Sequence, residues 1–284
     1  MVNGLLDRSE SLEPDTHPRD RRQPPVLWHL KVSHYNEKAR WALDYKRVPH
    51  VRHAAIPGRH ARIAQSLGAG RTFPVLELDG QILGDSTLII HALERRYPDP
   101  PLYPADPADT RRALEIEDFF DEEFGAYLRL LVLEHMLPDP RLFLGAFAPD
   151  LNAPRRLVAR AMYPLMRRKI AADFGIDRSG IERAWRKCRL AGERFAAELQ
   201  ANGYLVGGGF TVADLTVAAL LSPVVAPEQF PYPQPQRDHS RLADLRRMID
   251  DWGALEWARW IYAHHRSASM EVARMSPNAN VRSR

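Results

Sequence analysis

The chain has 284 residues, 45% of them hydrophobic, so it is long enough to form two domains with sizeable cores. Its formal charge of +4 is small, and acidic residues nearly match the arginines spread along the chain, which argues against a nucleic-acid partner. The single cysteine, Cys188, excludes an intrachain disulfide. Because neither a secretory signal pattern nor an apolar segment of membrane-spanning length is present, we expect a cytoplasmic protein with no membrane partner.

The first part of the chain is predicted to alternate strands and helices. Residues 1–24 are polar, charged and proline-bearing, so we expect a disordered tail there. The order β-α-β-α-β-β-α then defines an α/β domain over residues 25–97. Its strands are predicted at 26–30, 51–55, 75–78 and 81–83, and its helices at 34–46, 59–67 and 87–96.

The first helix of this domain is predicted to be amphipathic. Ala39 and Leu43 recur at helical spacing and are expected to face the core. The charged residues Glu37, Lys38 and Asp44 are expected to face solvent.

The second part of the chain is predicted to be all-helical. Residues 98–109 hold several prolines and are predicted to link the first domain to a helical domain over 110–265. Asp109 or Thr110 is expected to cap a long helix that ends near Met136. After an irregular segment at 138–154, helices are predicted at 155–174 (with a kink at Pro164), 179–201, 212–222, 241–251 and 254–264, followed by a polar tail at 266–284.

The stretch 71–87 is the most informative part of the sequence. Pro74 opens a short apolar strand, a position that need not donate to the sheet ladder. The Asp-Gly pair at 79–80 predicts a tight hairpin to the next strand. Asp85 or Ser86 can cap the helix that follows, and the N–H groups and positive dipole end of such a helix favour a bound carboxylate.

This order of proline, strand, turn, strand and capped helix resembles the second half of the thioredoxin-like domain in the glutathione S-transferase superfamily. The resemblance covers residues 26–265 and implies a thioredoxin-like N-terminal domain followed by an all-helical C-terminal domain, usually in a homodimer. It also implies a cis bond between Phe73 and Pro74, and backbone pairing of Phe73 with the cysteine of glutathione. The pair Asp85 and Ser86 would hold the γ-glutamyl end of the same ligand.

Further site residues are expected around this turn and at the start of the first helix. Arg71 directly precedes the turn and is the preferred cation for the carboxylates of a glutathione-like thiol. The segment 33–41 resembles the Ser-Pro-Tyr-Cys-x-Lys-Val-Arg pattern of many superfamily members. On that match, Ser33 stands where serine-type transferases keep the hydroxyl that activates glutathione. Asn36 stands where glutaredoxins keep a cysteine, so a thiol-based redox cycle is disfavoured.

Ser33 and Asn36 are therefore the candidate catalytic residues. A hydroxyl hydrogen bond lowers the pKa of the substrate's thiol, and Asn36 can serve as a second donor to the sulfur. The alternative for Ser33 is a plain helix cap, with its hydroxyl taken by the N–H of Tyr35 or Asn36. The alternative for Asn36 is a first-turn residue satisfied by the backbone.

The helical domain offers structural motifs and no further chemistry. Thr211 and Asp214 resemble the buried N-capping motif of the superfamily's helical domain, so we assign them a structural role. Acidic residues on the long helix are expected to form a solvated face rather than a cleft lining, and no histidine or cysteine set has metal-ligand spacing. These acidic residues are Asp118, Asp121, Glu122 and Glu123.

The sequence is thus identified as a member of the glutathione S-transferase superfamily, of serine type or of an unclassified bacterial type. The resemblance implies conjugation of glutathione, or a related low-molecular-weight thiol, to a small hydrophobic electrophile. No metal and no cofactor besides that thiol cosubstrate are expected. The alternative is a non-catalytic member that binds a ligand or protein partner, which the missing cysteine at 36, the long helical-domain insertions and both tails favour.

Overall fold

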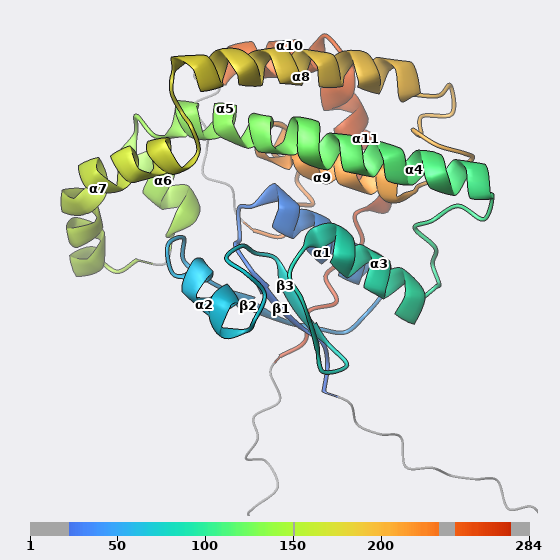
Figure 1. The fold of residues 1–284 in the computed structure, drawn as a ribbon, viewed down its shortest axis with the longest axis horizontal. Coiled ribbons are helices and arrows are strands. Elements are labelled where there is room, and N and C mark those ends of the chain that lie inside the picture. Colours follow the sequence, from blue (N-terminus) through green and yellow to red (C-terminus); the bar gives the residue numbers. More distant parts are fainter. Residues whose placement is uncertain (1–22, 150, 233–241, 274–284) are drawn as a thin grey trace, which may run out of the picture.

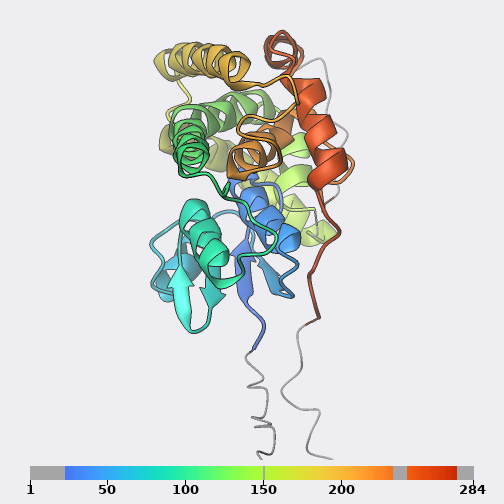
Figure 2. The same cartoon turned by 90° about the vertical axis from the view of Figure 1, so that its right-hand side faces the viewer.

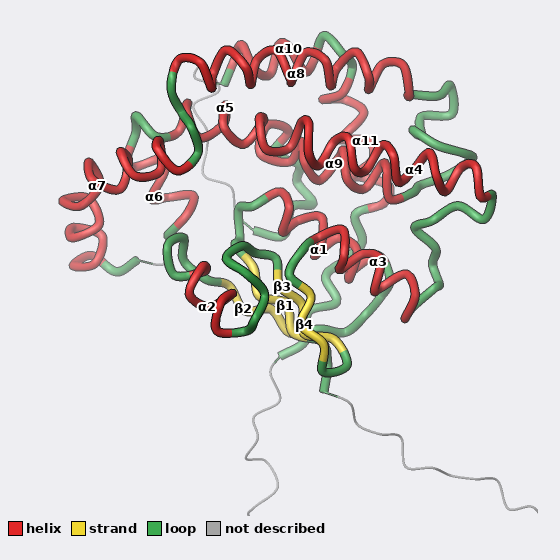
Figure 3. Tube along the Cα trace, in the orientation of Figure 1, coloured by secondary structure: helices red, strands yellow, loops and turns green. Residues whose placement is uncertain are grey.

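The computed structural model describes residues 23–149, 151–232 and 242–273 (Figure 1). Residues 1–22 of the tail expected at 1–24, and residues 274–284 of the tail expected at 266–284, lie outside the described residues. The N-terminal domain is a four-stranded sheet in the order β2-β1-β3-β4, with β2 parallel to β1 and the other neighbours antiparallel (Figure 3). Its elements are β1 (Val26–His29), α1 (His34–Tyr45), β2 (Val51–Ala54), α2 (His60–Ser66), β3 (Val75–Leu78), β4 (Gln81–Leu83) and α3 (Ser86–Arg96).

The rest of the described chain is helical and lies on one side of the sheet domain (Figure 2). The predicted fold class, a thioredoxin-like domain followed by an all-helical domain, is therefore confirmed. The elements of this domain are α4 (Pro107–Phe120), the π-helical turn η1 (Asp121–Gly125), α5 (Ala126–Met136), α6 (Pro140–Phe147), α7 (Ala153–Asp173), α8 (Arg178–Glu198), α9 (Val212–Val225), α10 (Ala243–Asp250) and α11 (Ala254–His265).

Two helices begin where the sequence analysis did not place them. The long helix is capped by Asp106, whose Oδ1 accepts hydrogen bonds from the next N–H groups at 2.8 and 3.0 Å, so the expected cap at Asp109 or Thr110 is wrong. The segment expected to be irregular contains α6, which Asp139 caps in the same way. Each cap is followed by proline, which is well suited to the first helical position because it has no N–H to leave unpaired.

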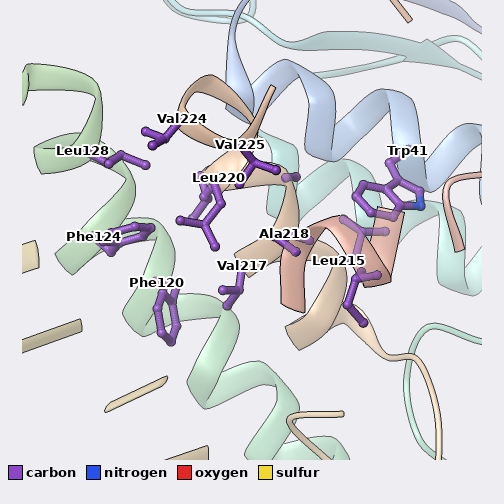
Figure 4. Close-up of a cluster of buried hydrophobic side chains, with 14 of the residues drawn as sticks. Trp41, Phe120, Phe124, Leu128, Leu215, Val217, Ala218, Leu220, Val224 and Val225 are labelled. Atoms are coloured by element: carbon purple, nitrogen blue, oxygen red, sulfur yellow. The ribbon is translucent and has the colours of Figure 1, made fainter. Parts of the chain in front are cut away.

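Helix α9 forms the centre of the core, and all of its residues are buried. Figure 4 shows it between α1, which contributes Trp41, and the α4–α5 region, which contributes Phe120 and Phe124. The predicted cap is present: Asp214 Oδ2 accepts from the N–H of Thr211 at 2.9 Å, and both halves of a capping box form. Most buried apolar residues of both domains join in one hydrophobic cluster, so the domains pack as a unit, while Ala64, Phe73 and Val75 form a second, smaller cluster.

The charged face expected for α1 is not exposed, which corrects the sequence analysis. Glu37, Lys38 and Asp44 are fully buried, because α3, α9 and the chain after α11 pack against the helix. Each buried charge has a partner of opposite sign. Arg40 donates from Nε to Glu37 Oε2 at 2.8 Å, and Arg52 donates to Asp44 Oδ2 at 2.6 Å.

The chain after α11 completes this network. Arg266 is buried, with Nε 2.7 Å from Glu37 Oε1 and Nη1 2.9 Å from Asp44 Oδ2. Beyond it, the N–H of Met270 donates to Asp44 Oδ1 at 2.8 Å, and the backbone pairs with His50 beside β2. The first residues of the expected C-terminal tail are therefore attached to the thioredoxin-like domain.

Replacing Arg266 by Ala should destabilise the protein strongly. The change leaves Glu37 and Asp44 buried with one cation fewer, and breaking a buried pair costs about 3–5 kcal/mol. Urea or thermal unfolding measures the loss. Arg259→Ala, at an exposed position of α11, is the matched control and should change the free energy of unfolding by less than about 0.5 kcal/mol. Equal stability of the two variants would contradict the assigned network.

Candidate functional site

The loop between β1 and α1 brings Ser33 to the turn that precedes β3. Asn36, fully buried in the first turn of α1, joins the two segments. Its Nδ2 donates to Ser33 Oγ at 2.8 Å and to the carbonyl of Phe73 at 3.2 Å, while its Oδ1 accepts from the N–H of Leu30 at 2.8 Å. The Phe73–Pro74 bond is cis, as predicted. Ser33, Asn36, Phe73 and Pro74 thus lie together.

These contacts distinguish between the roles considered for Ser33 and Asn36. Both amide hydrogens of Asn36 are engaged, so the residue positions the loop and has no hydrogen left for a bound sulfur. Ser33 stands at the N-cap position of α1, but its side chain makes no capping hydrogen bond. Its oxygen accepts from Asn36, and no described residue accepts its hydroxyl hydrogen. The hydroxyl can therefore donate to a ligand.

Arg40 holds the same loop from inside the domain, a role that the sequence analysis missed. Its guanidinium donates to the carbonyls of Leu30 at 3.1 Å and Lys31 at 3.2 Å, and its Nη1 lies 3.0 Å from His29 Nδ1. The side chain is fully buried and also pairs with Glu37. The only signal in the sequence was the arginine at the end of the superfamily-like pattern.

The residues next to Ser33 in the chain face the helical domain. Tyr35 donates from its hydroxyl to the carbonyl of Asp121 at 2.7 Å, and His34 Nε2 lies 3.2 Å from the carbonyl of Gly125. Burial lowers the pKa of His34 to about 3, so its ring is neutral. A Cβ at Gly125 would lie 2.6 Å from the Tyr35 hydroxyl, so a larger residue there would displace the Tyr35 side chain. These side chains fix the domain interface rather than a ligand.

The start of α3 forms the second part of the site. Asp85, which is exposed, is the cap: its Oδ1 accepts from the N–H groups of Thr87 at 2.8 Å and Leu88 at 3.2 Å. Ser86 is the first helical residue and is 3% exposed. Asp85 therefore occupies the N–H groups of Thr87 and Leu88 at this helix start and leaves that of Ser86 without this carboxylate.

A buried charge cluster lies directly behind α3. Lys38 Nζ is 2.7 Å from Glu117 Oε1 and 2.9 Å from Thr87 Oγ1, and it also pairs with Asp121. Burial raises the pKa of Glu117, against the opposing effect of the Lys38 charge. The expectation that Asp121 belongs to a solvated helix face is therefore wrong, because it closes an ion pair between the domains.

Arg71 is exposed, and no described residue forms an ion pair or hydrogen bond with it. It precedes the Phe73 turn, but the structure gives it no contact with Ser33, Asn36 or Ser86.

Cys188 is buried in α8, and burial raises the pKa of its thiol to about 12. A thiolate is therefore not available from the protein itself near neutral pH.

A cavity of about 260 Å³ lies beside the loop that leads to Ser33. Leu30, Lys31 and Val32 of that loop form one wall. Residues 54–57, from the last residue of β2 onward, form a second wall. The end of α6 with Phe147 and the connection to α7 form a third. The lining is apolar except for Lys31 and for Arg155 at the start of α7. Among the described residues, no group of potential ligands could hold a metal ion.

Comparison with known proteins agrees with this architecture. Residues 27–101 match the family described as "Glutathione S-transferase, N-terminal domain". The crystal structure of beta-etherase LigF from Sphingobium sp. strain SYK-6 is 18% identical with a TM-score of 0.54, over 84% of this chain and 99% of that chain. A search of curated proteins gave no match.

Two further solved structures contain glutathione. A glutathione S-transferase from Methylobacillus flagellatus KT with glutathione bound is 19% identical, with a TM-score of 0.55, over 84% of this chain and 95% of that chain. One from Ceriporiopsis subvermispora in complex with glutathione is 18% identical, with a TM-score of 0.56, over 84% of this chain and 96% of that chain. The two-domain fold is that of the glutathione S-transferases. Residues 27–101 thus match the N-terminal domain family of the glutathione S-transferases, and the chain shares its two-domain fold with solved glutathione S-transferases.

Replacing Asn36 by Ala should destabilise the loop around Ser33. The change leaves the partly buried N–H of Leu30 without its partner, at a cost of about 1–3 kcal/mol. Asn36→Asp keeps that acceptor but turns a carboxylate toward the Phe73 carbonyl, so it should also lower the free energy of unfolding in urea. Gln65→Ala, at an exposed position of α2, is the control. An Asn36→Ala protein as stable as the control would contradict the positioning role.

Proposed function

We propose that this protein is a serine-type thiol transferase that adds glutathione, or a related low-molecular-weight thiol, to a small apolar electrophile. The observation that carries the proposal is the Ser33 hydroxyl: Asn36 fixes its oxygen from one side and leaves its hydrogen free, beside the Phe73–Pro74 turn. A hydrogen bond from this hydroxyl to a bound sulfur favours the thiolate over the thiol.

The chemistry needs no thiol or metal from the protein. The substrate thiol loses its proton to solvent, and its thiolate then attacks the electrophilic carbon. A sulfur–carbon bond forms while a leaving group departs with its electron pair, or while a double bond accepts the pair and is then protonated. Ser33 acts by holding the thiolate at a lower pKa and in place.

The ligand's two ends match different parts of the site. The γ-glutamyl end of glutathione carries an ammonium and a carboxylate. Asp85 offers its second carboxylate oxygen to the ammonium, and Ser86 offers N–H and hydroxyl donors to the carboxylate at the start of α3. Arg71 is the proposed cation for the second carboxylate of glutathione, at the opposite end of the ligand. The glutathione bound in two proteins of this fold supports glutathione as the thiol.

The cavity beside the Ser33 loop is the proposed place for the electrophile. Its walls come from both domains, and its apolar lining, with Val32 and Phe147, suits a small hydrophobic molecule. The proposal includes the homodimer that the resemblance to the superfamily implies.

Replacing Ser33 by Ala should raise the pKa of the bound thiol. A rise of one pKa unit, about 1.4 kcal/mol, lowers the thiolate fraction near neutral pH by up to about tenfold. The pH–rate profile for conjugation of glutathione to an aryl halide should therefore shift upward, with turnover reduced at neutral pH and recovered at high pH.

Ser33→Thr, which keeps the hydroxyl, is the matched control and should retain most of the turnover. Thiol affinity should change little in either variant. If Ser33→Ala leaves the pH–rate profile where it was, the proposed activation is wrong. If the wild-type protein retains glutathione on an affinity column without conjugating aryl halides, the non-catalytic alternative is supported instead.

Replacing Ser86 by Ala should weaken glutathione binding without loss of stability. Asp85 remains as the helix cap, so the melting temperature should stay within about 2 °C of the wild type. The dissociation constant, measured by titration calorimetry, should rise about tenfold because a hydrogen bond to a charged group is lost. Unchanged affinity would remove Ser86 from the site.

A further inference from the structure

Helix α7 presents an apolar stripe to solvent. Of its 21 residues, only Tyr163 is fully buried. Leu157, Val158, Met162 and Leu165 are 70%, 63%, 52% and 62% exposed. Val158, Met162 and Leu165 are spaced by four and three residues, so they share one side of the helix with Leu157 at its edge. A surface helix normally turns such a stripe toward the core.

The core-facing side of α7 is already occupied by other residues. Tyr163 donates from its hydroxyl to the carbonyl of Leu137 at 2.9 Å, and it packs near Phe143 of α6. Half-buried Met166 and Ile170 pack against the same core. The exposed stripe is therefore a second apolar side, which the fold of the single chain does not need.

Basic residues border the stripe before and after it along the helix. Asp173 is the only acidic residue of α7, and it pairs with Lys169 at 2.9 Å. Within the part of the chain that the structure describes, none of the arginines of α7 forms an ion pair. The exposed cations are Arg155, Arg156, Arg160, Arg167, Arg168 and Lys169.

We propose that α7 docks on the surface of an anionic phospholipid membrane. Apolar side chains at the centre of an exposed helix, with cations around them, fit the boundary between acyl chains and negatively charged headgroups. Among the described residues, no helix is long and apolar enough to cross a membrane, so α7 would lie on it. This goes beyond the proposed function and departs from our expectation of no membrane partner, which rested on the lack of a signal pattern and of an apolar segment of membrane-spanning length.

Two other occupants fit the surface less well. A second copy of the chain would place its α7 cations against those of the first, and like charges repel. An acidic groove on a partner protein would have to match the shape of α7 and also place negative charge along the whole stripe. The surface of an anionic membrane is negative everywhere and needs no matching shape. Figure 1 shows α7 at the edge of the molecule, away from the sheet, where a flat surface can reach it.

Flotation of the full chain with lipid vesicles tests the proposal. The protein should float with vesicles of phosphatidylcholine and phosphatidylglycerol in equal amounts, and not with phosphatidylcholine alone. Raising the salt from about 0.1 M to about 1 M shortens the screening length from about 10 Å to about 3 Å and should release it.

Variants of α7 separate the two contributions. Arg160→Gln with Arg167→Gln should lower the vesicle partition coefficient about fivefold for each cation removed, or about 25-fold together. Met162→Ser with Leu165→Ser should lower it by about tenfold or more. Because these residues are exposed, the melting temperature should stay near that of the wild type.

Arg189→Gln with Leu190→Ser makes the same kind of change at exposed positions of α8 and should leave vesicle binding intact. The proposal is overturned if the protein fails to float with anionic vesicles, floats equally with neutral ones, or responds alike to the α7 and α8 changes. It is also overturned if the α7 variants abolish a dimer seen by sedimentation without lipid, which would make a second copy the occupant. Binding of the wild type to polyglutamate but to no vesicle would overturn it in favour of an acidic protein.

Discussion

The burial of charged side chains on α1 is the constraint on which the rest of the structure depends. Helices α3 and α9 pack against this helix, and the chain after α11 covers a further part of it. An isolated ion in such a place costs several kcal/mol, so each charge must have a partner. Glu37 is paired with Arg40 and Arg266, and Lys38 with Glu117 and Asp121.

These partners connect parts of the chain that lie far apart in sequence. Arg266 follows the last helix and Glu117 belongs to α4, so the thioredoxin-like domain reaches full pairing only when the helical domain and the C-terminal segment are in place. Buried ion pairs often add little net stability compared with apolar residues of similar size. We infer that their main effect here is to fix how α1, α4 and the C-terminal segment sit against one another.

The same network of buried side chains holds the proposed catalytic loop in place. Arg40 binds the loop carbonyls with the guanidinium that also pairs with Glu37, and Asn36 ties Ser33 to the Phe73 turn. A loop held from both sides in this way is preorganised, so a ligand need not order Ser33 on binding. Ser33 thus depends on residues that touch no ligand.

The sequence by itself determined the strand and helix order of the first domain, the Phe73–Pro74 turn and the Thr211 cap, because each is encoded by residues close together in the chain. It also placed Ser33 and Asn36 near that turn, although only through resemblance to the superfamily. The tertiary structure alone decided that Lys38 is buried, that Asn36 has no free donor, and that Arg266 completes a charge network. A prediction from an amphipathic pattern assumes that one side of the helix meets water. The charged side of α1 does not meet water, because residues up to 229 positions away in the sequence cover it.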